Sequence, residues 1–382
     1  MSDWKPATLG GFLSLQRGHD LAQRERKPGK VPVIGSGGVT GFHDTAVAPG
    51  PGITIGRAAN LGVPTLTQED FWPLNTTLYV TDFHGNDVRF AYYLLRTLDL
   101  TGFNSGSVQP MLNRNYIRDF PIVIPGLQEQ QAVAAVLGAI DDKIAVNGKV
   151  SGTALALGDA CFMKITHSSA TSRSTLAKLA SEKKLSFGDG YRTKRSEHGQ
   201  PGLPILRVAE VMDGSIQPKL DDFVSESYRS AMGAKVSQAG DVILTTKGTV
   251  GRVAAITEES LLFVYSPQVC YFRIPEGSPV LSSYVYFWLR SIDFWVQAAP
   301  RKSQTDMADY LSLTDIRNLT IPMPLEPGHP ATLVLGSLLA RVSACHEENK
   351  ALAALRDTLL PKLMSGQIRV RDAEKVVEDV TL

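Results

Sequence analysis

Residues 125–165 read PGLQEQQAVAAVLGAIDDKIAVNGKVSGTALALGDACFMKI, and this stretch predicts one long helix in the middle of the chain. Its first apolar side chains recur at spacings of four, three and four residues, which puts them on one helix face: Val133, Leu137, Ile140 and Ile144. Three glycines follow this stripe, and each costs about 1 kcal/mol relative to alanine inside a helix. Because such a helix is marginal on its own, we expect it to pack against a partner.

A second helix near the C-terminus carries a matching seam. Steps of three and four residues continue along it without a break, in the ladder Leu335, Leu338, Val342, Cys345, Asn349, Leu352, Arg356, Leu359 and Leu363. This spacing is typical of a coiled coil, and one asparagine in such a seam commonly fixes the register. We therefore predict that the two helices pair. Periodicity alone leaves open a second interpretation, in which both are unrelated surface helices of one globular domain.

Each long helix follows the same leader sequence, so the chain contains an internal repeat. YIRDFPIVIP at residues 116–125 matches DIRNLTIPMP at residues 315–324. The offset is constant along the match, as for Ile117 and Ile316 (316 − 117 = 199). A repeat with this long period predicts two domains of the same fold.

Both halves of the chain read as mixed α/β domains with the same order of elements. In the first half, predicted strands at residues 52–57 and 71–80 come before a predicted helix at residues 89–98. In the second half, GDVILTTKGTVG at residues 240–251 repeats the strand and turn of GITIGRAANLG with one residue more, and residues 283–295 repeat the helix. The predicted fold class is therefore α/β (α+β), with two similar mixed domains and two long helices.

These elements divide the chain into five predicted segments. They are a first α/β domain at residues 1–125, a central helix at residues 126–165, a second α/β domain at residues 166–325, a distal helix at residues 326–365 and a C-terminal tail at residues 366–382. We expect the tail to add a short strand after Gly366 and to end in a charged segment without regular structure.

Length, composition and cysteine usage are those of an ordinary cytoplasmic protein. The 382 residues are 43% hydrophobic and 20% charged, which suffices for two domains with full cores. No apolar run approaches the ~18 residues of a membrane span, and the N-terminus lacks the apolar core of a signal peptide. Cys161, Cys270 and Cys345 are far apart in the sequence, so neither a disulfide framework nor a zinc site is indicated. We expect a cytoplasmic protein that does not contact membranes.

Motifs for catalysis are missing from the sequence. The glycine-rich segment GSGGVTG at residues 35–41 lacks the lysine of a phosphate-binding loop, and no methyltransferase motif is present. Asp141 and Asp142 are neighbours on a predicted helix and point in different directions, which is more typical of a solvated face than of a nuclease site. We therefore expect no catalytic residue, no metal site and no cofactor.

Positive charge is clustered in the chain, although the net charge is only +1. Basic residues gather at residues 183–195 and at residues 301–302, whereas acidic residues concentrate in and beyond the predicted helices. Such segregation allows one basic face for a nucleic acid and another face for a protein partner.

Three stretches of the chain resemble the specificity (S) subunit of type I restriction-modification systems. They are VPVIGSGGVTGFHD with GITIGRAANLG and FWPLNTTLYV, then PGLQEQQAVAAVLGAIDDKIAVN, and finally LRDTLLPKLMSGQIRV. The resemblance covers nearly the whole length and implies two target recognition domains, each reading one half of a split sequence in double-stranded DNA. It also implies that two antiparallel helices act as a spacer and as the docking site for two modification (methyltransferase) subunits. Restriction subunits would join through the complex.

This resemblance has two further implications. A family subunit of this kind is not catalytic by itself, in agreement with the missing motifs. The second leader, PLEPGHPATLVLG, lacks the Glu-Gln-Gln of PGLQEQQAVAAVLG. Partner contacts at the second helix are therefore expected to be asymmetric, or that helix starts only after Pro330.

Residues in two classes are expected to carry the function. Lysine and arginine in loops would contact phosphates, and polar side chains would read base edges in the major groove. The predicted DNA-binding residues are Arg57, Asn60, Arg192, Lys194, Arg195, Lys247, Arg252, Arg301 and Lys302. The predicted residues of the helix seam and partner-docking site are Val133, Leu137, Ile140, Ile144, Leu338, Val342, Asn349, Leu352 and Leu359. For any one loop charge, simple solvation is the alternative.

Three other functions stay open at the level of the sequence. The chain could be a stand-alone nucleic-acid-binding adaptor of another defence system, and co-purification with a methyltransferase subunit separates this reading from the first. It could be an enzyme whose site is not visible, which methylation or cleavage by the isolated chain would reveal. It could also be a structural scaffold, which strong salt-dependent and sequence-dependent DNA binding would exclude.

The predicted helices also set a length that an insertion can test. A helix of roughly 30 residues spans about 45 Å, and duplex DNA rises about 3.4 Å per base pair. If the two helices separate the DNA-reading domains, adding one heptad to each will lengthen the unread spacer of the target by about three base pairs. Sequencing of methylated sites measures this spacer, and an unchanged spacer would contradict the prediction.

Overall fold

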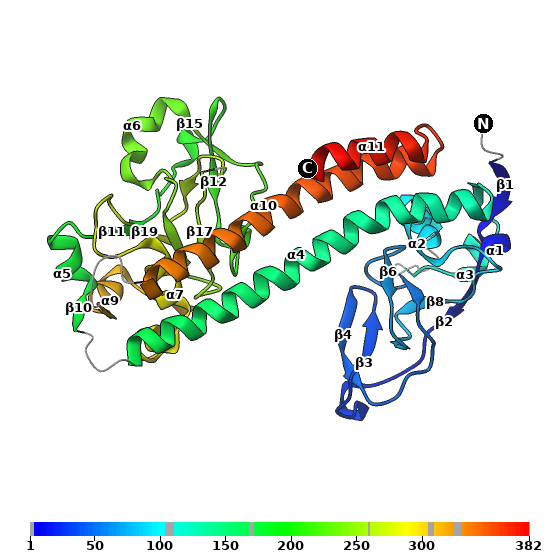
Figure 1. The fold of residues 1–382 in the computed structure, drawn as a ribbon, viewed down its shortest axis with the longest axis horizontal. Coiled ribbons are helices and arrows are strands. Elements are labelled where there is room, and N and C mark those ends of the chain that lie inside the picture. Colours follow the sequence, from blue (N-terminus) through cyan, green and yellow to red (C-terminus); the bar gives the residue numbers. More distant parts are fainter. Residues whose placement is uncertain are drawn as a thin grey trace. The chain divides into compact units, whose positions relative to one another are not determined.

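The computed structural model describes residues 4–103, 111–167, 172–258, 260–304, 309–323 and 330–381. The chain divides into two compact units. Unit 1 comprises Met1–Ile144 and Lys350–Leu382, and unit 2 comprises Ala145–Asn349. Each unit therefore contains an α/β domain together with one stretch of each long helix (Figure 1).

Unit 1 contains two small sheets, one strand pair and several helices. Its strands are β1 (Lys5–Thr8), β2 (Ser14–Arg17), β3 (Val31–Gly35), β4 (Gly38–His43), β5 (Gly52–Gly56), β6 (Pro64–Thr67), β7 (Trp72–Pro73), β8 (Thr77–Asp82) and β9 (Pro121–Ile124). Its helices are α1 (Leu9–Phe12), η1 (Gln23–Glu25), α2 (Val88–Thr97), η2 (Thr101–Phe103), α3 (Arg114–Ile117), the first part of α4 (Leu127–His167), the last part of α10 (Pro330–Met364) and α11 (Val370–Thr381). The sheets have the strand orders β2-β8-β5-β6 and β4-β3-β7, and β1 pairs with β9.

Unit 2 contains the corresponding sheets and three further strand pairs. Its strands are β10 (Arg173–Thr175), β11 (Ser186–Asp189), β12 (Gly202–Leu206), β13 (Val211–Met212), β14 (Ser215–Ile216), β15 (Phe223–Ser225), β16 (Val242–Thr245), β17 (Val253–Ala255), β18 (Val264–Tyr265), β19 (Val269–Arg273), β20 (Ser303–Gln304), β21 (Asp309–Tyr310) and β22 (Thr320–Pro322). Its helices, besides the remaining parts of α4 and α10, are α5 (Leu176–Ser181), η3 (Arg195–Glu197), η4 (Val208–Glu210), η5 (Glu226–Tyr228), α6 (Arg229–Met232), η6 (Gly233–Lys235), α7 (Ser282–Arg290), α8 (Ile292–Ala298), η7 (Ala299–Arg301) and α9 (Leu313–Arg317). The sheets have the orders β11-β19-β16-β17 and β15-β12-β18, and the pairs are β10-β22, β13-β14 and β20-β21.

Every strand of unit 1 has a counterpart in unit 2, which adds the pairs β13-β14 and β20-β21. The order β2-β8-β5-β6 corresponds to β11-β19-β16-β17. In the three-stranded sheets, the central strand β3 or β12 runs antiparallel to one neighbour and parallel to the other. The pair β1-β9 corresponds to β10-β22, and both are antiparallel. The structure thus confirms the internal repeat and the mixed α/β fold class that the sequence predicts.

The repeated leader sequence forms the same structure in both units. Its first part is a short helix, capped by Asn113 in α3 and by Ser312 in α9, whose side chains accept backbone hydrogen bonds of 3.0 and 3.1 Å. Its isoleucines Ile117 and Ile316 are both fully buried. The strand that follows then pairs with the first strand of the same unit. A buried isoleucine and a strand pair therefore attach each leader to its own α/β domain.

The core of unit 1 lies between the four-stranded sheet, α2 and the two long helices. Asp87 caps α2 by accepting a 2.8 Å hydrogen bond from the Phe90 amide, and α2 buries the face that carries Phe90 and Leu94. One cluster joins these side chains to β5, β8, α4 and α10. Its members include Ile53, Ile55, Leu78, Val80, Val133, Leu137, Ile140, Leu352, Leu359 and Leu363.

The core of unit 2 is centred on α7, whose side chains from Ser283 to Leu289 are all buried. Phe162 of α4 and Leu335 of α10 join the same cluster. Where α4 crosses α7, a Cβ atom added at Gly158 would lie 2.2 Å from the ring of Phe287. This glycine, which the sequence marks only as unfavourable for a helix, thus permits close packing of the two helices.

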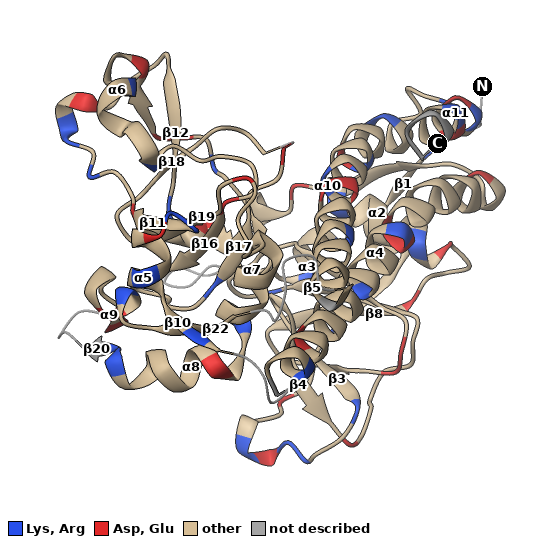
Figure 2. Ribbon diagram, turned by 60° about the vertical axis from the view of Figure 1, so that its left-hand side comes forward, with Lys and Arg blue, Asp and Glu red and all other residues tan. Residues whose placement is uncertain are grey.

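In each unit α4 lies against α10, and the two helices run antiparallel (Figures 1 and 2). In unit 1, Arg356 donates to Asp141 over 2.7 Å. In unit 2, the buried Asn147 amide donates to Asn349 over 3.0 Å and to Glu348 over 2.8 Å. The predicted helix pairing is therefore confirmed, and Asn349 finds a polar partner that the sequence analysis did not select. None of the described helices is long and apolar enough to cross a membrane.

One predicted helix of unit 2 is divided in the structure. The stretch predicted as one helix, residues 283–295, forms α7 and α8 with Ser291 between them. Ser291 has extended backbone angles, and its hydroxyl caps α8 by accepting a 3.3 Å hydrogen bond from the Phe294 amide. Serine competes with the helix backbone for hydrogen bonds and favours caps, which explains the break.

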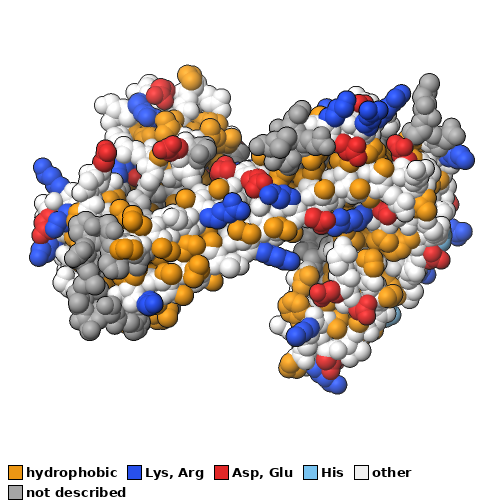
Figure 3. Space-filling view, viewed as in Figure 1, with side chains coloured by type: hydrophobic (Ala, Val, Ile, Leu, Met, Phe, Trp, Pro, Cys, Tyr) orange, Lys and Arg blue, Asp and Glu red, His pale blue; other side chains and the backbone are white. Residues whose placement is uncertain are grey.

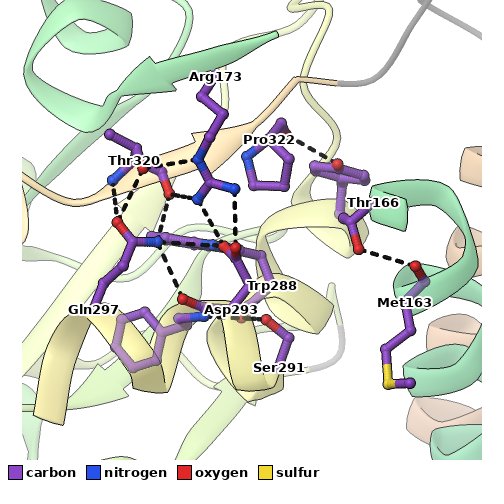
Figure 4. Close-up of polar contacts among 11 residues, drawn as sticks. Met163, Thr166, Arg173, Trp288, Ser291, Asp293, Gln297, Thr320 and Pro322 are labelled. Atoms are coloured by element: carbon purple, nitrogen blue, oxygen red, sulfur yellow. Dashed lines mark hydrogen bonds and ion pairs between the residues drawn. The ribbon is translucent and has the colours of Figure 1, made fainter. Parts of the chain in front are cut away.

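The break at Ser291 allows α8 to bind the entry strand of unit 2. Arg173 of β10 donates two hydrogen bonds of 2.9 and 3.0 Å to the Asp293 carboxylate and one of 2.8 Å to the Thr320 carbonyl (Figure 4). Trp288 donates its indole N–H to the same carboxylate over 2.9 Å. The network fixes β10 and β22 onto α8.

The prediction for the C-terminal tail was wrong. Instead of a strand and an irregular end, residues Val370–Thr381 form α11. The chain reverses at Gly366, whose φ of +68° favours glycine. Val370, Ala373 and Val377 then recur at helical spacing, and Ala373 is fully buried in the core of unit 1. Charged residues between them concealed this short apolar stripe.

Two glycines of α4 provide a matched stability test. Gly152→Ala should raise the free energy of unfolding by about 1 kcal/mol, because alanine favours the helix and the added methyl group meets no atom within 4 Å. Gly158→Ala should lower it, because its methyl group would overlap the Phe287 ring in the packed core. Denaturant unfolding of both variants measures the difference, and equal effects would contradict the packing role of Gly158.

Candidate nucleic-acid interface

Two topologically equivalent turns follow the central strands of the four-stranded sheets. We name residues 56–62 of unit 1 turn A and residues 245–251 of unit 2 turn B. A hydrogen bond from the last residue to the first closes each turn, from Gly62 N to Gly56 O and from Gly251 N to Thr245 O, both over 2.9 Å. Near the middle, Ala59 and Gly248 both have a positive φ, of 65° and 79°. The two turns therefore have similar backbone conformations despite their different sequences.

Each turn is held by a second segment of its unit. The Leu112 amide donates to the Arg57 carbonyl over 2.8 Å, and the Leu311 amide donates to the Thr246 carbonyl over the same distance. This pattern makes Arg57 the structural equivalent of Thr246. Lys247 of turn B then occupies the position after it. The cations predicted on matching turns are thus shifted by one position relative to each other.

Arg57 and Asn60 of turn A have different environments. Arg57 is half-buried and donates a long 3.4 Å hydrogen bond to the Asn75 carbonyl. Burial lowers the pKa of its guanidinium from the ordinary value, and the charge of Arg17 lowers it further. Asn60 is exposed, and its amide nitrogen lies next to Gly37 in the β3-β4 turn. Turn A therefore presents one confined cation and one accessible amide.

The structure brings Lys247, Arg301 and Lys302 together beside the β20-β21 hairpin. Lys247 is exposed and forms a backbone bridge with Tyr310 of β21. Lys302 forms a 2.6 Å ion pair with Asp309 of the same strand. Arg301 is exposed and donates over 2.6 Å to the Gln297 carbonyl. These three predicted residues form one basic group next to turn B.

Arg252 of unit 2 directly follows turn B. Its side chain is half-buried and donates over 3.0 Å to the Val211 carbonyl of β13. Its backbone amide donates over 2.9 Å to the Thr245 hydroxyl. Both contacts give Arg252 a structural role, and its DNA contact stays a prediction.

Arg192, Lys194 and Arg195 are exposed on the segment between β11 and β12. The buried carboxylate of Glu197 accepts a 2.9 Å hydrogen bond from the Lys194 amide and thereby orders the segment. Figure 2 shows lysine and arginine positions along the loops and helices of both units, with acidic residues between them. The three cations thus form a second basic group, on a loop other than turn B.

The predicted seam residues are mostly buried within the chain. In unit 1, Val133, Leu137, Ile140, Leu352 and Leu359 are buried in the core, and Ile144 packs against it. In unit 2, Val342 is buried, Leu338 is half-buried and Asn349 bonds to Asn147. These residues hold the helices together, so little of their surface is left for a partner protein.

Other residues form the exposed apolar surface of the long helices. Figure 3 shows apolar side chains along α4. The exposed ones on the two helices are Leu127, Val146, Leu157, Met163, Leu333 and Val334. The sequence analysis missed them because it followed only the stripe with the strongest periodicity. Large apolar side chains off that stripe were the available signal.

Asp141 and Asp142 both form ion pairs, and the Asp142 side chain is still 60% exposed. Asp141 accepts 2.7 Å hydrogen bonds from Tyr93 and Arg356. Asp142 forms a bidentate pair with Arg89, which lowers the pKa of the carboxyl group. The interpretation as a solvated face was therefore incomplete, and both aspartates stabilise unit 1. Among the described residues, no group of three or more His, Cys, Asp or Glu side chains could hold a metal ion.

The fold defines a class of protein with two α/β units of corresponding topology and paired long helices. The family model described as "Type I restriction modification DNA specificity domain" matches residues 1–151. A solved structure, the S subunit of a type I restriction-modification system from M. genitalium, covers 95% of this chain and 96% of that chain with a TM-score of 0.64 and 18% identity. The chain is thus similar to the specificity subunits of type I restriction-modification systems.

Curated relatives agree with this family. The EcoprrI specificity subunit of Escherichia coli is 24% identical over 143 residues, which span 36% of each chain. The MjaIX specificity subunit of Methanocaldococcus jannaschii is 21% identical over 305 residues, which span 74% of this chain and 69% of that subunit. Both are specificity subunits of type I restriction enzymes, and such subunits are the non-catalytic components of these enzymes.

Proposed function

We propose that the chain is the DNA sequence-specificity subunit of a type I restriction-modification complex. Each unit would read one half of a split target in double-stranded DNA. Two methyltransferase subunits would bind the long helices, and restriction subunits would join through that complex. The observation that carries the proposal is the duplication. The two units have the same strand order, and in each unit a turn that contains a cation follows the equivalent strand, β5 or β16.

The charges around the turns support DNA as the ligand. Arg57 and Asn60 in turn A would contact a phosphate and a base edge, and Lys247 with Arg301 and Lys302 would contact phosphates beside turn B. Arg192, Lys194 and Arg195 would add phosphate contacts from the second basic group of unit 2. Their exposed positions agree with this role.

The exposed apolar residues of the long helices support a protein partner. Val146, Leu157 and Met163 on α4 are each about half exposed, at 52%, 51% and 48%. Apolar side chains that recur along one element are typical of a docking surface. We propose that the methyltransferase subunits contact this surface rather than the buried seam.

The central test is the sequence that the chain selects in a host. Co-expression with a methyltransferase subunit should methylate one split sequence, with two specified halves and a fixed number of unread base pairs between them. Sequencing of methylated host DNA measures this pattern. The methyltransferase subunit without the chain is the control. A continuous target, or methylation that does not depend on the chain, would refute the proposal.

A pair of substitutions near turn B separates DNA contact from stability. Lys247→Gln should weaken binding to every duplex and reduce the slope of log K against log salt by about 1, with no change in the free energy of unfolding. Arg252→Gln should instead lower the free energy of unfolding by about 1 kcal/mol, because the Val211 carbonyl loses its donor. Fluorescence anisotropy at several salt concentrations and denaturant unfolding measure both quantities. Lower stability in Lys247→Gln, or weaker DNA binding without lower stability in Arg252→Gln, would contradict the proposed roles.

A further inference from the structure

Three arginines of unit 1 line one pocket beside turn A. Arg17 is the last residue of β2, Arg57 follows β5 and Arg114 is the first residue of α3. The pocket has a volume of about 300 Å³, and its other lining residues are Leu78, Met111, Leu112 and Asn113. The strands and the short helix thus bring together three cations that are distant in the sequence.

No described residue neutralises these three guanidinium groups. Arg57 and Arg114 each donate to a backbone carbonyl over a long 3.4 Å, to Asn75 and Leu15 respectively. None of the three forms an ion pair with a carboxylate among the described residues. The pKa of Arg57 is lowered by burial and by the charge of Arg17, so these two cations repel each other. An anion bound between them would remove this repulsion.

Unit 2 shows that the fold does not require Arg17. In unit 1, Arg17 lies opposite Leu78 in the β2-β8 ladder, and Leu78 lies opposite Ile55 of β5. In unit 2, Asp189 lies opposite Cys270 in the corresponding ladder, so Asp189 takes the place of Arg17. Asp189 forms a 3.4 Å ion pair with Lys235. The equivalent position therefore carries the opposite charge.

The other two arginines are also absent from the equivalent positions. Thr246 takes the place of Arg57, as the hydrogen bonds to turns A and B show. Leu313 takes the place of Arg114, because both follow the leader leucine by two residues at the constant offset (313 − 114 = 199). The same fold thus forms with aspartate, threonine and leucine at these positions. The arginine cluster is a feature of unit 1 that folding does not explain.

We propose that the pocket formed by Arg17, Arg57 and Arg114 binds one phosphate group of the DNA backbone and thereby anchors unit 1 to the DNA. The equivalent position of unit 2 lacks these arginines and does not bind a phosphate in this way. This inference rests on the proposed function. A base edge is read by a single bidentate arginine, whereas a phosphate oxygen cluster accepts from several guanidinium groups at once. Three converging arginines therefore fit a phosphate better than a base.

The test uses the full chain in complex with its methyltransferase subunit. One duplex carries the sequence identified by methylation-site sequencing, and a second duplex has an unrelated sequence. Arg17→Gln, Arg57→Gln and Arg114→Gln should each weaken binding to both duplexes by about tenfold. Each should also reduce the slope of log K against log salt by about 0.9. The double variant Arg17→Gln with Arg57→Gln should lose less than the product of the single losses, because both side chains hold one group.

Two variants serve as matched controls. Arg24→Gln removes the same charge from an 88% exposed side chain that already pairs with Glu25, and it should leave affinity unchanged. Arg17→Lys keeps the charge and should retain the salt slope of the natural chain. Unfolding of each variant is followed in parallel, and the natural residues of unit 2 indicate that the fold tolerates these replacements.

The other outcomes would each overturn the inference. Unchanged affinity in all three glutamine variants, with normal binding by the natural chain, would refute the pocket alone. If the variants lost affinity only for the duplex with the target sequence, and specificity at one base pair of the target were relaxed, the arginines would be assigned to base reading. Tight binding of inorganic phosphate to the pocket, with unchanged DNA affinity in the variants, would assign it to a free anion. A natural chain that binds neither duplex would refute the proposed function as well.

Discussion

The pairing of each leader strand with the first strand of its own unit is the constraint on which the architecture depends. β9 pairs with β1, and β22 pairs with β10, so backbone hydrogen bonds hold the leader strand of each unit in its own α/β domain. The buried isoleucines of α3 and α9 anchor the same segments in the cores of their units. Each α/β domain is therefore closed by a pairing between its first and last strands.

Much of the fold follows from periodicity, because repeated apolar spacing reports local structure directly. The long helices could be predicted in this way, and the leader repeat and the strand-turn elements could be predicted by matching segments of the sequence to one another. Features that depend on individual side-chain contacts were harder to predict. Ser291 divides a helix whose composition is otherwise continuous, and Gly158 matters only because Phe287 lies against it. Such contacts join residues that are distant in the sequence.

The candidate interface could be predicted only in part for the same reason. A loop cation looks the same in a sequence whether it reaches solvent, like Lys247, or a backbone carbonyl, like Arg252. The ion pairs of Asp141 with Arg356 and of Asp142 with Arg89 were likewise not visible in the sequence. Comparison of the two units supplies the missing information, since equivalent positions separate what the topology needs from what each unit adds. Asp189 in the place of Arg17 is the clearest case.

The contact between Gly158 and Phe287 also determines which side of a helix faces outward. A helix of 41 residues could rotate about its axis without breaking a single backbone hydrogen bond. An aromatic ring that lies against bare backbone at one position removes this freedom in unit 2. The absence of one methyl group thus sets the rotational phase of α4 there, and with it the row of side chains that another molecule can touch.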